Sequence, residues 1–256
     1  MSADLIVSPD IAALEAELLT RIAQAKKSAP EAPLLVVAPS QTILWRIRRA
    51  LLEAGQAHLN LHLLHHQALA EKILLSAGEE PPRVAREPLL LALLTGILEN
   101  SKGLLRSYAL AFPGALSGLH GTLNDLREAG IDTKAARRFL KEAGSAELTG
   151  LYAAYEKALD RLHRERNLSD RAGLVARAIE AAPRAPILRE ACGLIHYGAY
   201  ELVRIHADLL AACSGSTALT ILAPGGTGPA FDYSRSTLAA WPQASTAKRG
   251  VATQGS

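Results

Sequence analysis

Four of the eight histidines cluster in one short segment, at His58, His62, His65 and His66. Imidazole is a common metal ligand, so this spacing could offer a metal site. The segment spans an expected strand and the start of the following helix, which should point the rings in divergent directions. The nearest carboxylate is Glu71. Exposed loop histidines are the interpretation we favour; contacts to nucleic acid or phosphate, and metal binding, stay open.

The turn after the first expected strand is where a nucleotide hydrolase would hold phosphate. A phosphate-binding loop reads Gly-x-x-x-x-Gly-Lys-Ser/Thr, because glycine amides surround the phosphate and lysine neutralises it. Here the turn contains Ser8, Pro9 and Asp10, with no glycine and no lysine. Proline removes one N–H donor and the carboxylate repels phosphate. We expect no triphosphate binding at this turn, and no cofactor or catalytic metal.

Basic residues form two local groups on expected helices. The densest is Trp45-Arg46-Ile47-Arg48-Arg49, in which Arg46 and Arg49 share a face and Trp45 and Arg49 are i,i+4 neighbours. The second group consists of Lys157, Arg161, Arg164 and Arg166. Each group can be a solvated helix face, which is the commoner case, or a binding patch.

Composition describes a soluble globular chain of one or two domains. The 256 residues are 49% hydrophobic and 21% charged, with a net charge of only +3. Two cysteines, Cys192 and Cys213, exclude a disulfide framework and are expected as free thiols. Apolar runs are too short for a membrane span, and the N-terminus lacks the basic region of a signal peptide, so we predict a cytoplasmic location. Aromatic residues at 4% disfavour modules that stack bases on several exposed rings.

Apolar patterning predicts strands alternating with helices in the first 76 residues. Short apolar runs at 5–7, 34–38 and 59–64 are each followed by helical spacing, over 11–29, 41–55 and 66–76. Such alternation with tight connections is typical of a parallel sheet. Strands are expected again at 193–197 and 218–223, with a helix over 201–213 between them.

The region between these two parts has helical spacing throughout and no run that resembles a strand. We therefore predict four segments: residues 1–85 as the first part of an α/β domain, 86–182 as an all-helical insertion, 183–223 as the second part of the α/β domain, and 224–256 as a loop or poorly ordered tail.

Several segments follow one another in the order of a known family. The strand 34–38 ends in Pro39-Ser40-Gln41, and residues 64–74 read Leu-His-His-Gln-Ala-Leu-Ala-Glu-Lys-Ile-Leu. Residues 168–174, 194–201 and 220–226 follow. In this order they resemble motif Ia and the "TFHSLA..IL", "hDFxDLL", "hhhDEFQD" and "hhGDxxQ" motifs of UvrD-like superfamily 1 DNA helicases. The resemblance is closer to the degenerate helicase region of AddB-type subunits, which precedes a PD-(D/E)XK exonuclease domain, and it covers only the N-terminal half of such proteins.

The departures from this family pattern all fall on nucleotide chemistry. The phosphate-binding lysine is absent, Tyr197-Gly198 replaces the magnesium-binding Asp-Glu pair, and no glutamine follows Ala223. The resemblance therefore implies a degenerate nucleotide site at Ser8, Pro9, Asp10, Tyr197 and Gly198, without ATP hydrolysis. It also implies a parallel αβα sheet of P-loop NTPase type with a large helical insertion.

From this resemblance we expect a catalytically inactive helicase-like domain of a bacterial DNA repair or recombination nuclease–helicase system. Its partners would be DNA, single-stranded and bound without sequence preference, and a helicase or nuclease subunit or a C-terminal nuclease domain. The expected DNA contacts are Ser40, Gln41, Arg46, Arg49, His65 and His66. Two alternatives remain: a structural protein-interaction module that touches no DNA, and an active ATP-dependent helicase or exonuclease component with an unusual site.

Overall fold

The computed structural model describes residues 3–142, 145–198, 202–226 and 231–232. The chain forms two compact units: residues 1–79 together with 177–256, and residues 80–176. The second unit thus begins and ends six residues earlier than the insertion expected at 86–182. Most of the tail expected at 224–256 lies outside the described residues. None of the described helices is long and apolar enough to cross a membrane.

A five-stranded parallel sheet forms the centre of the first unit. Its strands are β1 (Ala3–Ser8), β2 (Leu34–Val37), β3 (Leu61–Leu64), β6 (Gly193–Tyr197) and β7 (Leu219–Pro224). They lie in the order β1-β7-β6-β2-β3, and every neighbouring pair is parallel. All five strands therefore end at the same edge of the sheet. The expected α/β fold with a parallel sheet is confirmed.

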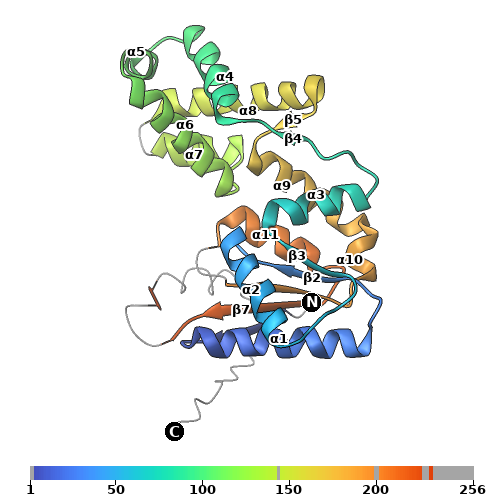
Figure 1. Cartoon of the computed structure of the whole chain (residues 1–256). Coiled ribbons are helices and arrows are strands. Elements are labelled where there is room, and N and C mark those ends of the chain that lie inside the picture. Colours follow the sequence, from blue (N-terminus) through green and yellow to red (C-terminus); the bar gives the residue numbers. More distant parts are fainter. Residues whose placement is uncertain (1–2, 143–144, 199–201, 227–230, 233–256) are drawn as a thin grey trace. The chain divides into compact units, whose positions relative to one another are not determined.

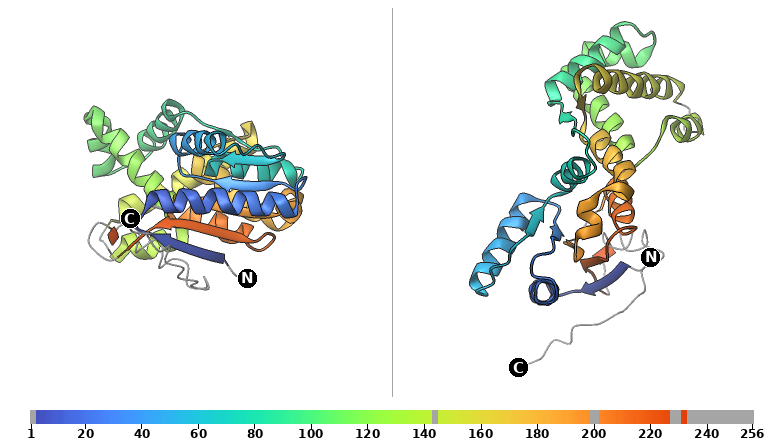
Figure 2. Two further views of the ribbon diagram at one scale, coloured as in Figure 1. Left: turned by 60° about the horizontal axis from the view of Figure 1, so that its bottom comes forward. Right: turned by 90° about the vertical axis from the view of Figure 1, so that its right-hand side faces the viewer.

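Helices cover both faces of this sheet. The first unit contains α1 (Ile11–Ser28), α2 (Gln41–Glu53), α3 (His66–Ser76), the 3-10 helix η1 (Ala182–Arg184), α10 (Pro186–Glu190) and α11 (Arg204–Cys213). Helices α1 and α2 share one core with alternate strand residues such as Val36, Ile195 and Tyr197. The right-hand view of Figure 2 shows these blue helices on one side of the sheet and the orange α10 and α11 on the other.

Side chains alternate along a strand, and this alternation determines which of them point to the face of the sheet away from α1 and α2, here called the second face. In β6, Ile195 and Tyr197 point into the core with α1 and α2, so Leu194 and His196 point the opposite way. Leucines and alanines of α3 and α11, among them Leu69 and Leu209, are buried there. The apolar runs in β2 and β6 are continuous because both faces are covered, as parallel strands require.

The second unit is a helical bundle. It contains β4 (Arg83–Val84), α4 (Glu87–Glu99), α5 (Leu104–Ala111), α6 (Pro113–Glu128), α7 (Thr133–Glu142), α8 (Ala146–Arg166), β5 (Leu168–Ser169) and the start of α9 (Arg171–Ala181). Figure 1 labels each of these elements. Leucines from α4 and α8 and the rings of Tyr152 and Tyr155 form its core.

One expectation for this unit needs correction. The insertion was expected to be all helical, but Leu168 and Ser169 form the short strand β5, which pairs in parallel with Arg83 and Val84. A pair of two-residue strands is too short to leave an alternating apolar pattern, so the sequence carries little signal for it.

Candidate nucleic-acid interface

The carboxyl edge of the sheet is where the predicted site residues can meet. Neighbouring strands lie about 4.8 Å apart, and β7 separates β1 from β6, so the turns after β1 and β6 lie about 10 Å apart. Open α/β sheets bind ligands outside this edge. The turns after β1, β2, β3 and β6 carry the residues that the family resemblance singles out.

The turn after β1 satisfies its own backbone donors. Ser8 is buried, and its Oγ accepts a hydrogen bond from the N–H of Asp10 at 3.1 Å. The Oδ1 atom of Asp10 in turn accepts from the N–H of Ala12 at 2.8 Å and caps α1. The helix N-terminus that would hold a phosphate therefore has a carboxylate on it already.

The turn after β6 holds no carboxylate at the two positions that matter most. The Tyr197 ring is buried in the core with α1 and α2. Gly198 adopts a positive φ of 81°, and its N–H donates to the carbonyl of Leu222 at 2.9 Å. Residues 199–201, which belong to the same family motif, lie outside the described residues. A ring packed in the core and a glycine offer no ligand to magnesium.

A stack of three histidines, which we call the histidine stack, fills the second face near this edge. The Nε2 atoms of His66, on α3, and His196, on β6, lie 3.0 Å apart. The ring of His206, on α11, is parallel to that of His66 with a centroid separation of 4.0 Å. The Nδ1 atom of His196 is buried without a hydrogen-bond partner. The stack thus joins three separate elements of the first unit.

Burial keeps the histidine stack neutral. Loss of water around the rings is the largest cause and lowers the pKa of His66 to about 2, of His196 to about 3 and of His206 to about 4. Repulsion among the three rings lowers the pKa of His66 and His196 further. Among the described residues, no group of three or more His, Cys, Asp or Glu side chains is arranged to hold a metal ion.

The two histidines expected to contact DNA have other partners. The Nδ1 atom of His65 accepts from the N–H of Ala68 at 3.1 Å and caps α3. His66 is only 5% exposed, so its ring has no surface for a phosphate. A neutral buried ring also supplies no positive charge, and we leave His66 out of the candidate interface.

Helix α2 presents the other predicted residues at the surface. Ser40 caps it, with Oγ accepting from the N–H of Ile43 at 3.3 Å, and Gln41 is exposed beside it. Trp45 is 66% exposed, and the guanidinium carbon of Arg48 lies 5.0 Å from its ring centroid. The exposed Trp45 ring and the partly buried Arg48 lie on a helix that begins at the carboxyl edge of the sheet.

Carboxylates offset part of the charge on α2. The Nε atom of Arg46 lies 2.5 Å from Oε2 of Glu15 on α1. Arg49 pairs with Glu53, one turn along α2, at 2.7 Å. Both arginines are more than half exposed. Both guanidinium groups can still contact a polyanion, but the phosphates then compete with Glu15 and Glu53 for them.

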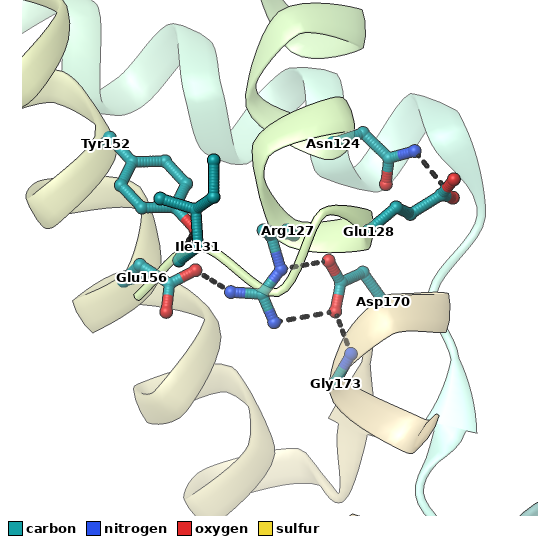
Figure 3. Close-up of polar contacts among 8 residues, drawn as sticks. All are labelled: Asn124, Arg127, Glu128, Ile131, Tyr152, Glu156, Asp170 and Gly173. Atoms are coloured by element: carbon teal, nitrogen blue, oxygen red, sulfur yellow. Dashed lines mark hydrogen bonds and ion pairs between the residues drawn. The ribbon is translucent and has the colours of Figure 1, made fainter. Parts of the chain in front are cut away.

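A buried ion network in the second unit has a structural role. Arg127 of α6 pairs with Asp170, which precedes α9, and with Glu156 of α8 (Figure 3). Asp170 also accepts from the N–H of Gly173 at 2.8 Å and so caps the start of α9. Asp170 lies within the segment that resembles the "hDFxDLL" motif. Its contacts explain why a carboxylate is required there, without implying chemistry.

Comparison with known proteins adds no assignment: no family model matches the chain, and no curated protein matches it.

Proposed function

We propose that this chain is a catalytically inactive, helicase-like domain of a DNA repair or recombination nuclease–helicase system, and that it binds single-stranded DNA through α2. The observation that carries the proposal is the exposed Trp45 ring with Arg48 beside it, on the helix that follows β2. An exposed indole stacks on bases of any sequence, and neighbouring cations attract phosphate. This pairing is typical of surfaces that bind single strands without reading sequence.

The arrangement of the sheet supports the helicase-like part of the proposal. In the family resemblance, the turns after β1 and β6 hold nucleotide together, which requires that both strands end at one edge and close to each other. The strand order β1-β7-β6-β2-β3 meets that requirement. The strand that resembles motif Ia, β2, lies beside β6.

The local contacts at those turns support the inactive part. Asp10 accepts from the N–H of Ala12 at the start of α1 and places a carboxylate there, and Tyr197 is packed into the core. Restoring phosphate binding would need a different backbone at the first turn and a carboxylate in place of a buried ring. Both changes would alter the local backbone or the core packing, so a simple exchange of side chains would not restore the nucleotide site.

Fluorescence of the intact chain provides the test. The sequence contains two tryptophans, Trp45 and Trp241, so a Trp241→Phe background reports Trp45 alone. Titration with oligo(dT) of 20 nucleotides at low salt should quench this emission. Loss of stacking in Trp45→Ala should weaken binding about 10-fold, as expected for roughly 1–3 kcal/mol per stacked base. A labelled oligonucleotide follows the binding of that variant by anisotropy.

Leu52→Ala is the matched control, because Leu52 is exposed on the same helix but carries neither charge nor ring. It should leave affinity within twofold of the parent. Absence of oligonucleotide binding at 50 mM salt, or equal affinity of the Trp45→Ala and parent chains, would refute DNA binding through α2.

The second candidate function is docking of a partner subunit by the second unit. An apolar groove of about 550 Å³ lies between α5 and α6, lined by Tyr108, Phe112 and small residues that include Gly114 and Gly118. Tyr108 and Phe112 are both more than half exposed, with their ring centroids 5.0 Å apart. Exposed aromatic rings beside a groove are typical of protein interfaces.

A photocrosslinking residue at position 108, introduced in the cell of origin, tests this second function. A single adduct that forms at position 108, not at position 52, and disappears in Phe112→Asp would support docking. Absence of an adduct would count against it.

A further inference from the structure

The excess positive charge of the chain is concentrated on one short helix of the second unit. Helix α7 carries four cations and one acid, a formal charge of +3 that equals the net charge of all 256 residues. Over the rest of the chain, acidic and basic residues are therefore equal in number. A surface whose field differs in this way from the rest of the molecule is a candidate for binding a polyanion.

Three of these cations share one exposed face, which we call the α7 stripe: Lys134, Arg137 and Arg138. Their i, i+3, i+4 spacing aligns them along about 6 Å of the helix axis. The opposite face, with Ala136 and Leu140, is buried in the core of the second unit. Packing of α7 thus fixes the direction in which the stripe faces.

Within the described residues, the α7 stripe differs from five other exposed arginines in having no acidic partner, although exposed cations such as Arg83 and Arg171 also form no ion pair there. Arg46, Arg49, Arg161, Arg184 and Arg204 each pair with a carboxylate. Among the described residues, none of the three stripe cations forms an ion pair. Like charges at i,i+3 and i,i+4 destabilise a helix. A bound anion would reduce this repulsion among the three cations and so stabilise α7.

A phosphodiester backbone fits this stripe better than an isolated anion does. A nucleic acid supplies several charges at regular spacing, one per 1.7 Å or so of duplex axis, and can meet all three cations together. Phe139 is 57% exposed on the flank of the stripe and offers a ring to a base or sugar. An acidic peptide has less regular charge and gains less from that ring.

We propose that the α7 stripe is a second nucleic-acid contact, which binds the phosphate backbone without sequence preference. The inference takes DNA as the polyanion from the proposed function, but it uses a different unit and different residues. Lys134, Arg137 and Arg138 neutralise neighbouring phosphates, and the contact releases counterions from the nucleic acid.

The experiment measures anisotropy of fluorescein-labelled oligo(dT) and of a labelled duplex with the intact chain, over a salt series. The variant is Lys134→Glu/Arg137→Glu/Arg138→Glu. Arg161→Glu/Arg164→Glu/Arg166→Glu makes the same change of charge on α8 and is the matched control. Neutral glutamine substitutions at the three stripe positions provide a second variant if charge reversal disturbs folding, which circular dichroism checks.

We expect the stripe variant to weaken oligonucleotide binding at least about 10-fold at 50 mM salt. Its plot of log affinity against log salt should be shallower by about 2, since three cations each contribute about 0.7 on single strands. The α8 control should change affinity less than threefold. Binding of the duplex in preference to the single strand, with the same loss in the stripe variant, also supports the inference.

Other outcomes separate this inference from the proposed function. Unchanged affinity of the stripe variant, when Trp45→Ala is weakened, overturns the α7 contact alone. If instead the stripe variant is weakened and Trp45→Ala binds like the parent chain, the α2 interface is overturned and the α7 contact is supported. Competition by polyglutamate as strong as that by unlabelled oligo(dT), at equal charge, would identify an acidic protein as the partner and overturn a nucleic-acid contact.

Discussion

The Nε2 atoms of His66 and His196 lie 3.0 Å apart although 130 residues separate them in the chain. This contact ties α3 to the central strand β6, and the parallel ring of His206 adds α11. All three rings must be neutral, because a buried imidazolium beside two other imidazoles would be desolvated and repelled. The fold of the first unit is therefore coupled to pH.

The first prediction is a loss of stability in mild acid. In the unfolded chain each histidine takes up a proton near its ordinary pKa of about 6.5, whereas in the fold the pKa is about 4 for His206 and lower for the other two. The contribution of the neutral histidine stack to the free energy of unfolding is therefore fully present above pH 6.5 and is lost as the pH decreases toward 4. Each histidine contributes a slope of up to about 1.4 kcal/mol per pH unit.

Hydrogen exchange at the backbone amides of residues 193–197 measures this effect within the first unit, between pH 7 and 5. The protection of these amides, corrected for intrinsic rates, should fall steeply with acid. The His206→Gln variant removes one titrating ring and should show a shallower fall. Equal slopes for variant and parent would contradict the assignment to the histidine stack.

The second prediction concerns the ion network of the second unit. Arg127→Met leaves the carboxylates of Asp170 and Glu156 without their cation, and Asp170 is almost fully buried. Breaking such a pair from one side costs about 3–5 kcal/mol. Thermal unfolding should show a decrease in melting temperature of many degrees. Arg161→Met, which removes an exposed pair with Glu165, should cost under about 1 kcal/mol.

The third prediction is the loss of a helix cap. Asp10→Ala removes the acceptor for the N–H of Ala12 and should cost about 1 kcal/mol of stability in the first unit. Magnesium-ATP should still leave the melting temperature unchanged, because removing the carboxylate adds neither glycine amides nor a lysine. If magnesium-ATP raised the melting temperature of the parent chain or of the Asp10→Ala variant by several degrees, that would contradict the inactive assignment.

Local patterns account for the elements but not for the contacts between them. The strand at 193–197 and the helix at 66–76 agree with the structure residue for residue, since the strand is a short continuous run of buried residues and the helix has apolar residues at helical spacing. The capping of α1 by Asp10 also follows from residue type and position. The helix expected over 201–213 begins at Arg204, and residue 201 lies outside the described residues.

Contacts between distant residues explain what the sequence could not reveal. The interpretation of the clustered histidines grouped His66 with its neighbours in sequence, whereas its partners are His196 and His206. One signal was available: His196 lies within an apolar strand, where a polar side chain requires a buried partner. Similarly, the Arg49–Glu53 pair follows from i,i+4 spacing, but the Arg46–Glu15 pair depends on the packing of α1 against α2.

The last prediction is that a magnesium-binding pair cannot be restored by two substitutions. Tyr197→Asp would place a carboxylate in the core with α1 and α2 and remove a buried ring, which alone costs about 3–5 kcal/mol. Gly198→Glu would force a side chain onto a backbone with φ of 81°, at a further cost of about 1–2 kcal/mol. We expect the double variant to be strongly destabilised in urea and to bind no magnesium-ATP by calorimetry. A stable double variant that binds nucleotide would show that the edge of the sheet retains a usable site, and would favour the active alternative over the inactive one.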